Sequence, residues 1–294
     1  MRESHVSHVP PRAPSSRSRS SSMTFDRRTF LRRAGIGAAG AGALAAGITP
    51  AVGAQSSIPA GLGALPGAGV GVPIGTLLDY ASGPPSAASI RAAGHMGAVR
   101  YCSNRRPGAE WMTGKPLLRR EVDDFRRSGL NMVSCYQYGR AETADWREGA
   151  AGGDRHAPIG IRIHREAGGP SGVPMYVAID DNPTRWQFDN QIRPYLERWR
   201  AQLHGAGMEL GVYANAPTID WCRQTGLGRY FWQHDWGSGG RLNPSATIHQ
   251  LPVRQQVTVG GVVSDLNRVY ALDYGQWWPV DPIALAQSAL GSSI

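Results

Sequence analysis

The chain has 294 residues, of which 41% are hydrophobic, so it is long enough to bury the core of one large domain or two small ones. Its net charge of +9 belongs mostly to the first 54 residues, which hold eight arginines and two acids, whereas the remainder holds 23 basic and 20 acidic residues. No basic run interleaved with aromatic residues follows residue 55, which argues against nucleic acid as a partner.

An export signal precedes the domain. Arg27 and Arg28 stand before an Ala/Gly-rich run that ends in a small-residue site at Ala54, which predicts a cleavable twin-arginine signal peptide over residues 23–54. The run is poor in strongly apolar residues, so a retained anchor is the weaker alternative. We therefore expect the twin-arginine translocase as a partner, no stable membrane span after cleavage, and a secreted or envelope-associated protein.

Two segments flank this signal. Residues 1–22 are rich in Pro, Ser and Arg and are predicted to be a disordered extension or a mis-assigned start, because Met23 opens a signal of ordinary length. Residues 55–73, rich in Gly, Ala and Pro, are predicted to be a flexible lead-in to a domain over 74–294.

Eight runs rich in β-branched or aromatic residues are predicted as strands: 75–80, 97–103, 131–139, 174–180, 209–215, 229–233, 247–251 and 261–267. Helical patterns at 86–94, 117–129 and 190–207 separate several of them. Later connections are shorter, with room for about two helical turns after 215 and a hairpin pattern over 252–260. Strand and helix in alternation predict a parallel sheet, here an irregular (β/α)8 TIM-like barrel with reduced helices in its second half. A doubly wound open sheet is the alternative, although no glycine-rich nucleotide motif supports it.

The cysteines and histidines carry no metal pattern. Cys102, Cys135 and Cys222 lie in apolar or aromatic settings and are interpreted as small buried hydrophobic residues, with one disulfide permitted by export. The histidines form no HExxH motif, and we expect neither a metal nor another cofactor.

Polar side chains stand at the predicted ends of the strands, where the active site of a (β/α) barrel lies. They are Asp79, Tyr80, Arg100, Tyr101, Tyr136, Gln137, Asp180, Asp181, Asn182, Tyr213, Asn215, Gln233, Gln250, Asp265 and Asn267. Sugars offer hydroxyls to acids and amides and CH faces to aromatic rings, so this mixture indicates a carbohydrate site.

A resemblance to a known family is carried by seven segments in order: GTLLDY, VRYCS, MYVAIDDNP, LGVYAN, YFWQHDW, IHQLP and GGVVSDLN. They resemble the glycoside-hydrolase-like "domain of unknown function 1906" family of twin-arginine-exported actinobacterial proteins. More distantly they are similar to the family 25 glycoside hydrolases, the muramidase lysozymes. The resemblance covers about residues 74–278 and implies an irregular barrel with a role at the cell wall.

The resemblance also implies a catalytic set. In the muramidases the fourth strand ends in Asp-x-Glu, and here Asp180 matches the Asp while Asn182 replaces the proton-donating Glu. An amide cannot act as a general acid, so a carboxyl pair must be completed from elsewhere. Asp79 and Asp265 match muramidase acids on the first and last strands, which adjoin in a closed barrel. Asp181 is expected to point out of the pocket, since neighbours on a strand alternate.

The predicted catalytic residues are therefore Asp180, Asp79 and Asp265, with Asp235 as a fallback. The predicted substrate-binding residues are Asn182, Tyr101, Tyr136, Gln137, Tyr213, Trp232, Gln233 and Gln250. Among the tryptophans, Trp232 and Trp236 are the preferred sugar-stacking platforms. Three functions stay open: an exported glycoside hydrolase acting on cell-wall glycan, most plausibly peptidoglycan; an inactive carbohydrate-binding protein of the same fold; and a regulator or scaffold of envelope assembly.

Overall fold

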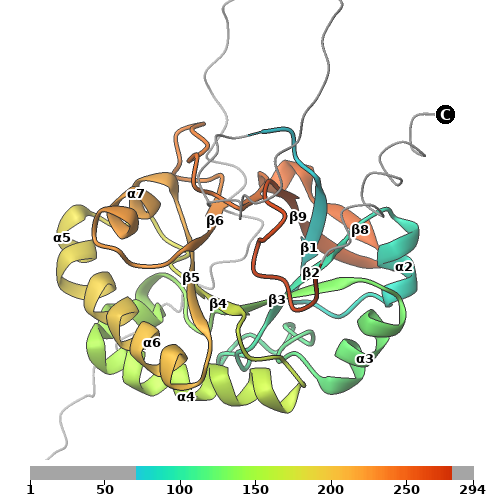
Figure 1. The fold of residues 1–294 in the computed structure, drawn as a ribbon, viewed down its shortest axis with the longest axis horizontal. Coiled ribbons are helices and arrows are strands. Elements are labelled where there is room, and N and C mark those ends of the chain that lie inside the picture. The colour runs from blue at the N-terminus through green and yellow to red at the C-terminus, as the bar shows by residue number, and fades with distance from the viewer. Residues whose placement is uncertain (1–70, 280–294) are drawn as a thin grey trace, which may run out of the picture. The chain divides into compact units, whose positions relative to one another are not determined.

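One nine-stranded sheet runs through the residues that the computed structural model describes, 71–279 (Figure 1). Its strands are β1 (Gly75–Asp79), β2 (Gly97–Tyr101), β3 (Asn131–Tyr136), β4 (Pro174–Ala178), β5 (Glu209–Ala214), β6 (Tyr230–His234), β7 (Ile248–Gln250), β8 (Val257–Val259) and β9 (Val262–Val269). Strands β1 to β7 are neighbours in chain order and run parallel, and β9 pairs with both β7 and β1. This pairing closes eight strands into a barrel, which confirms the TIM-like prediction and excludes the open sheet.

Several predictions fall outside the described range. The extension over residues 1–22, the signal peptide over 23–54 and most of the lead-in over 55–73 lie there, as do residues 280–294 of the predicted domain. None of the helices between residues 71 and 279 is long and apolar enough to span a membrane.

The last strand of the barrel runs against the other seven, which the strand–helix alternation did not predict. Between Gln250 and Val262 the chain forms η4 (Val253–Gln255) and β8 in place of a crossover helix, and a parallel pairing needs such a crossover. Gly260 and Gly261 both have positive φ and make the two-residue turn of the β8–β9 hairpin, which confirms the hairpin predicted in this stretch. β9 therefore returns antiparallel and brings its own residues to the end of β1.

Helices cover the outside of the barrel in the connections between β1 and β6. They are α2 (Ala87–Ala92), α3 (Arg119–Arg127), α4 (Ala150–Glu166), α5 (Arg185–Gln187), α6 (Arg193–Gly205) and α7 (Ala216–Gln224), with the short turns η1 (Ala141–Thr143), η2 (Asp145–Glu148) and η3 (Phe188–Ile192). Ser86 accepts a hydrogen bond from the Ser89 amide and caps α2. In the described part of the chain, the connections after β6 contain no α-helix, so the helices are reduced as predicted.

Helix α4, which the sequence did not predict, is the longest helix between residues 71 and 279 and lies beside α6 (Figure 1). Its glycines make this approach possible. A methyl group on Gly160 would lie 2.9 Å from the Trp199 ring and 2.8 Å from the Tyr136 ring, and one on Gly153 would lie 2.6 Å from the Cβ of Arg198. The residues that lower the helix propensity of this segment are thus required by its packing.

Strand side chains alternate between two cores. Inside the barrel lie Leu77, Val99, Cys135, Tyr176, Tyr213, Trp232 and Val269, and between strands and helices lie Ile90, Cys102, Phe125, Tyr136, Leu196, Trp199 and Cys222. All three cysteines are buried free thiols, as the sequence indicated, and the permitted disulfide does not form.

Candidate active site

Asp79 and Asp265 face each other at the barrel mouth, the end at which β1 to β7 finish. They are register partners of β1 and β9, so both side chains project from the same face of the sheet. Asp79 is 1% exposed, whereas Asp265 is half-buried and accepts a hydrogen bond from Gln256 Nε2 at 2.6 Å. The two acids that the sequence placed on the first and last strands are therefore neighbours.

The Asp79 carboxylate accepts three hydrogen bonds. Tyr101 Oη donates to Oδ1 at 3.0 Å, and Gln250 Nε2 and Asn267 Nδ2 donate to Oδ2 at 2.9 and 2.8 Å. These bonds favour the charged form, but burial and then the negative charge of Asp265 outweigh them and raise the pKa of Asp79 to about 7. Asp79 can consequently hold a proton near neutral pH.

Asp180 lies two residues beyond the end of β4 and has different surroundings. Gln137 Nε2 donates to its Oδ2 at 2.8 Å, and Arg140 Nε lies 3.8 Å from the same oxygen. Its side chain is 17% exposed. Asp180 is thus held from the segment after β3, whereas Asp79 is held from β2, β7 and β9.

Tyr213, on β5, connects the two sides of the mouth. Its hydroxyl donates to Gln250 Oε1 at 2.7 Å, and Gln250 donates in turn to Asp79. Burial raises the pKa of the Tyr213 phenol well above its usual range, and the charges of Asp180, Asp79 and Asp265 raise it further. Tyr213 thus links β5 to the Asp79 side of the mouth, and Asp180 directly follows Ile179, whose amide donates to the Tyr213 carbonyl at 2.7 Å.

Three predicted substrate-binding residues, Tyr136, Gln233 and Trp232, have other roles in the structure. Tyr136 faces outward, where its hydroxyl bonds His156 Nδ1 at 2.7 Å; its neighbour Gln137 takes the inward direction, because adjacent residues alternate. Gln233 is used by the loop after β6, with Nε2 donating to the Arg241 carbonyl and Oε1 accepting from the Asn243 amide, each at 2.8 Å. Trp232 is 1% exposed and has no free ring face for a sugar; it donates to Asn267 Oδ1 at 2.7 Å and so supports Asp79.

Asn182 and Asp181 leave the fourth strand in a tight turn. Asn182 is exposed, and its Oδ1 accepts from Asn215 Nδ2 at 2.9 Å, while Asn215 Oδ1 caps α7 through the Thr218 amide. Asp181 accepts from the Asn182 amide at 3.2 Å, and burial raises its pKa. The Asn that replaces the muramidase Glu is thus anchored to the start of α7.

Trp236 is an exposed aromatic residue of the loop that follows β6. Its indole is stacked on His234 with ring centroids 4.5 Å apart, and His234 lies 5.1 Å from the Tyr213 ring. Burial lowers the pKa of His234 to about 4, so the ring is neutral, and its Nδ1 donates to the Trp236 carbonyl at 2.6 Å. Trp236 is 40% exposed, which leaves it available to a ligand. Asp235, the alternative catalytic acid predicted from the sequence, lies 3.5 Å from His249 Nε2.

A family model for the "Rv2525c-like, glycoside hydrolase-like domain" matches residues 88–271. The chain belongs to this family. It is 50% identical over 205 residues to the Mycobacterium tuberculosis protein named "Putative peptidoglycan hydrolase Rv2525c", covering 69% of this chain and 84% of that protein. Crystal structures of the Tat-secreted Rv2525c with L-tartrate and with HEPES superpose with TM-scores of 0.67 and 0.66, and each covers 70% of this chain and 100% of the other.

The sequence analysis overlooked one residue of the mouth, and membership in the family does not point to it either. Lys115, in the loop between β2 and α3, is buried, and its Nζ donates to the Gln137 carbonyl at 2.7 Å. It belongs to no strand end and no motif, so the search of strand ends passed over it. The signal that would have found it is compositional, because the 294 residues contain one lysine and 30 arginines.

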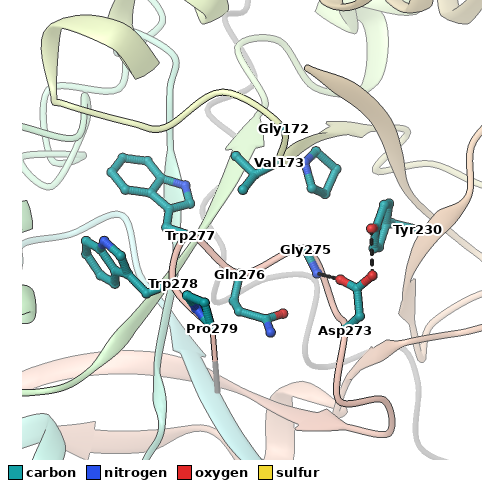
Figure 2. Close-up of a pocket in the computed structure, with 10 residues that line it drawn as sticks. Gly172, Val173, Tyr230, Asp273, Gly275, Gln276, Trp277, Trp278 and Pro279 are labelled. Carbon is teal, nitrogen blue, oxygen red and sulfur yellow. Dashed lines mark hydrogen bonds between the residues drawn. The ribbon is translucent and has the colours of Figure 1, made fainter. Parts of the chain in front are cut away.

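A hollow of about 280 Å³ lies at the opposite end of the barrel, where β4 and β6 begin (Figure 2). Asp273 accepts there from Tyr230 Oη at 2.8 Å and from the Gly275 amide at 3.3 Å. The residues around it include Val173, Pro174, Gln276, Trp277 and Trp278. The active sites of (β/α) barrels lie at the carboxyl ends of the strands, so we place the candidate site at the mouth and not at this hollow.

Proposed function

We propose that the protein is an exported glycoside hydrolase that acts on cell-wall glycan, and specifically on peptidoglycan. The observation that carries the proposal is the register pairing of Asp79 with Asp265 at the barrel end where β4 also finishes, two residues before Asp180. The family, the name of the mycobacterial relative and its Tat secretion support the same substrate and location, together with the twin arginines of this chain.

The pair Asp79 and Asp265 supplies the proton. Two carboxylates that face each other cannot both ionise without cost, and Asp79 is buried, so the pair retains one proton at neutral pH. Asp265 is the more exposed member and is the one that a glycosidic oxygen reaches. The pair thus takes the general-acid role that Asn182 cannot fill.

Asp180 supplies the negative charge. Oriented by Gln137 and Arg140, this side chain stabilises the positive charge that develops on the sugar as the glycosidic bond breaks, and water then adds to the same carbon and returns a proton to the Asp79–Asp265 pair. Trp236, fixed from below by His234, offers a flat surface to the CH face of a neighbouring sugar. Hydrogen bonds from Tyr101 and Gln250 fix the position of the Asp79 carboxyl, and Tyr213 in turn fixes Gln250.

A carbohydrate-binding protein without turnover is the second candidate, and Asn182 is the observation that favours it. The test is to incubate the purified protein with peptidoglycan and to measure new reducing ends. Release that disappears in Asp180→Asn supports the hydrolase. Retention on the glycan without release supports the binding protein, and the absence of both overturns both candidates.

A further inference from the structure

Lys115 is the single lysine of the chain, and it is 4% exposed. Everywhere else the sequence uses arginine for positive charge. An ammonium group is a compact charge with three donors, whereas a guanidinium is a broad planar fork, so the two are not interchangeable in a closed space. The buried position of the one lysine indicates a specific task.

The Lys115 ammonium contacts groups at the ends of two neighbouring strands, β2 and β3. Its Nζ donates to the Gln137 carbonyl at 2.7 Å, and it lies 4.0 Å from the centroid of the Tyr101 ring, a cation–π contact. Ser103 Oγ donates to the same Gln137 carbonyl at 2.6 Å. Gln137 is therefore fixed by two donors on its backbone oxygen.

Each of these two contacts leads to a different acid. Gln137 donates its side-chain amide to Asp180, and Tyr101 donates its hydroxyl to Asp79. We propose that Lys115 is a positioning residue of the active site, whose buried ammonium fixes the two donors that orient Asp180 and Asp79. This inference rests on the proposed function of the acids for its activity readout, but the geometry that it predicts can be measured without turnover.

The charge of Lys115 is maintained against burial. Burial lowers its pKa to about 8; Arg106 and Arg100 lower it as well, while Cys135 and Asp145 raise it. Tyr101 from β2 and the Gln137 carbonyl complete the groups that face the ammonium. Above pH 8 the neutral amine loses the cation–π contact and the charge-assisted part of its hydrogen bond, so the hold on Gln137 weakens.

The uniqueness of the lysine makes a direct test possible. Protein labelled with ¹⁵N-lysine gives one Nζ signal, and we expect it to titrate with a midpoint near pH 8. The side-chain amide signal of Gln137 should follow the same midpoint in the unmodified protein and lose that step in Lys115→Met. A Gln137 signal that does not follow the Nζ titration, or that is unchanged in a folded Lys115→Met variant, would overturn the proposal.

Ser103→Ala is the matched control, because it removes the other donor to the same carbonyl and leaves the charge in place. In Ser103→Ala the Gln137 signal should shift at every pH and still show the step near pH 8. Loss of the step in this variant would mean that Lys115 does not act on Gln137 through its charge, and would overturn the proposal as well. This arm needs no glycan and decides the matter even if the protein proves not to be a hydrolase.

Where release of reducing ends is measurable, a double-mutant cycle separates positioning from simple packing. Lys115→Met should lower release by about tenfold to a hundredfold, as misplacement of a reacting group does. In a Gln137→Ala background, from which the amide contact with Asp180 has been removed, Lys115→Met should cost clearly less than in the unmodified protein, and the remaining loss is the part that acts through Tyr101 and Asp79. Effects that multiply fully would show that Lys115 does not act through Gln137.

Discussion

Asp79 lies directly opposite Asp265 because β9 runs antiparallel to β1, and this register places both carboxyl groups on the inner face of the mouth. A parallel eighth strand would have delivered a different set of residues to the same level. The antiparallel return also sets Asn267 within 2.8 Å of Asp79 and Gln250 opposite Asn267. The acid pair and its amide donors thus depend on one feature of the topology.

Replacement of Asp265 should change the titration of Asp79. The negative charge of Asp265 raises the pKa of Asp79, so Asp265→Asn is expected to lower it below its value of about 7. The change in the pKa of Asp79 is measured from the pH dependence of the ¹³C signal of its carboxyl, or from the midpoints of the pH–activity profile. Asp235→Asn is the matched control, since Asp235 pairs with His249 outside the three acids, and it should leave the midpoint in place. An unmoved Asp79 midpoint in Asp265→Asn would contradict the pairing.

The same carboxyl should leave a signature in stability. Its folded pKa of about 7 lies above its usual value of 3.8, so the folded state binds more protons than the unfolded chain between these limits. Stability from this group is present below about pH 4 and is lost as pH rises through 7. We expect Asp79→Asn to gain relative to the unmodified protein, by on the order of 2 to 4 kcal/mol, between pH 4 and pH 8. Urea unfolding at the two pH values tests this, and parallel pH profiles of the two proteins would refute it.

Removal of the Trp236 ring should weaken glycan binding. Trp236→Ala is expected to reduce affinity for soluble peptidoglycan fragments by about tenfold, because a stacked ring contributes roughly 1 kcal/mol or more. Trp236→Phe should retain most of the affinity. Leu272→Ala, at an exposed apolar residue just before the hollow of Figure 2, serves as control and should bind normally. Equal affinity of Trp236→Ala and the unmodified protein, measured by calorimetry, would exclude the platform.

Export should depend on the two arginines. Changing Arg27 and Arg28 together to lysine is expected to keep the protein in the cytoplasm, because the translocase reads the paired guanidinium groups. Changing Arg32 and Arg33 in the same way keeps a comparable charge and should permit export. Immunoblots of culture filtrate, envelope and cytoplasm distinguish the two, and export of the Arg27/Arg28 variant would count against the twin-arginine route.

The glycines of α4 predict a packing effect. Gly160→Ala should destabilise the fold by about 1 to 3 kcal/mol, because its methyl group would meet the rings of Tyr136 and Trp199 at less than 3 Å. Gly205→Ala, at the end of α6, meets nothing within 4 Å and should be neutral or slightly stabilising. Thermal unfolding compares the two, and equal melting temperatures would show that α4 can move away from α6.

The sequence was sufficient to locate the barrel strands and insufficient for what depends on long-range register, and the catalytic role of the three acids stays a prediction. Hydrophobic runs located every barrel strand, and the stripe of Ile192, Leu196, Trp199 and Leu203 is fully buried as expected. Helix α4 was not predicted, since its glycines and Pro158 are poor helix formers whose value appears only against α6.

Side-chain directions at the candidate site also depend on long-range register and could not be predicted. Tyr136 and Gln137 were both assigned to the mouth, although adjacent strand residues must diverge, and only the register of β3 decides which of them turns inward. The identity of the acids followed from a family resemblance, but the reversal of β9 and the loop-borne Lys115 did not. Both depend on contacts between segments that are distant in the chain.

Asn267 contacts Asp79 across 188 positions of sequence, so the candidate site is assembled from segments far apart in the chain. A ribosome-bound chain that still lacks its final strand has no proton-sharing pair, whatever earlier portions have already folded. The Asp79–Asp265 pair therefore forms only after the last strand has been synthesised and the barrel has closed.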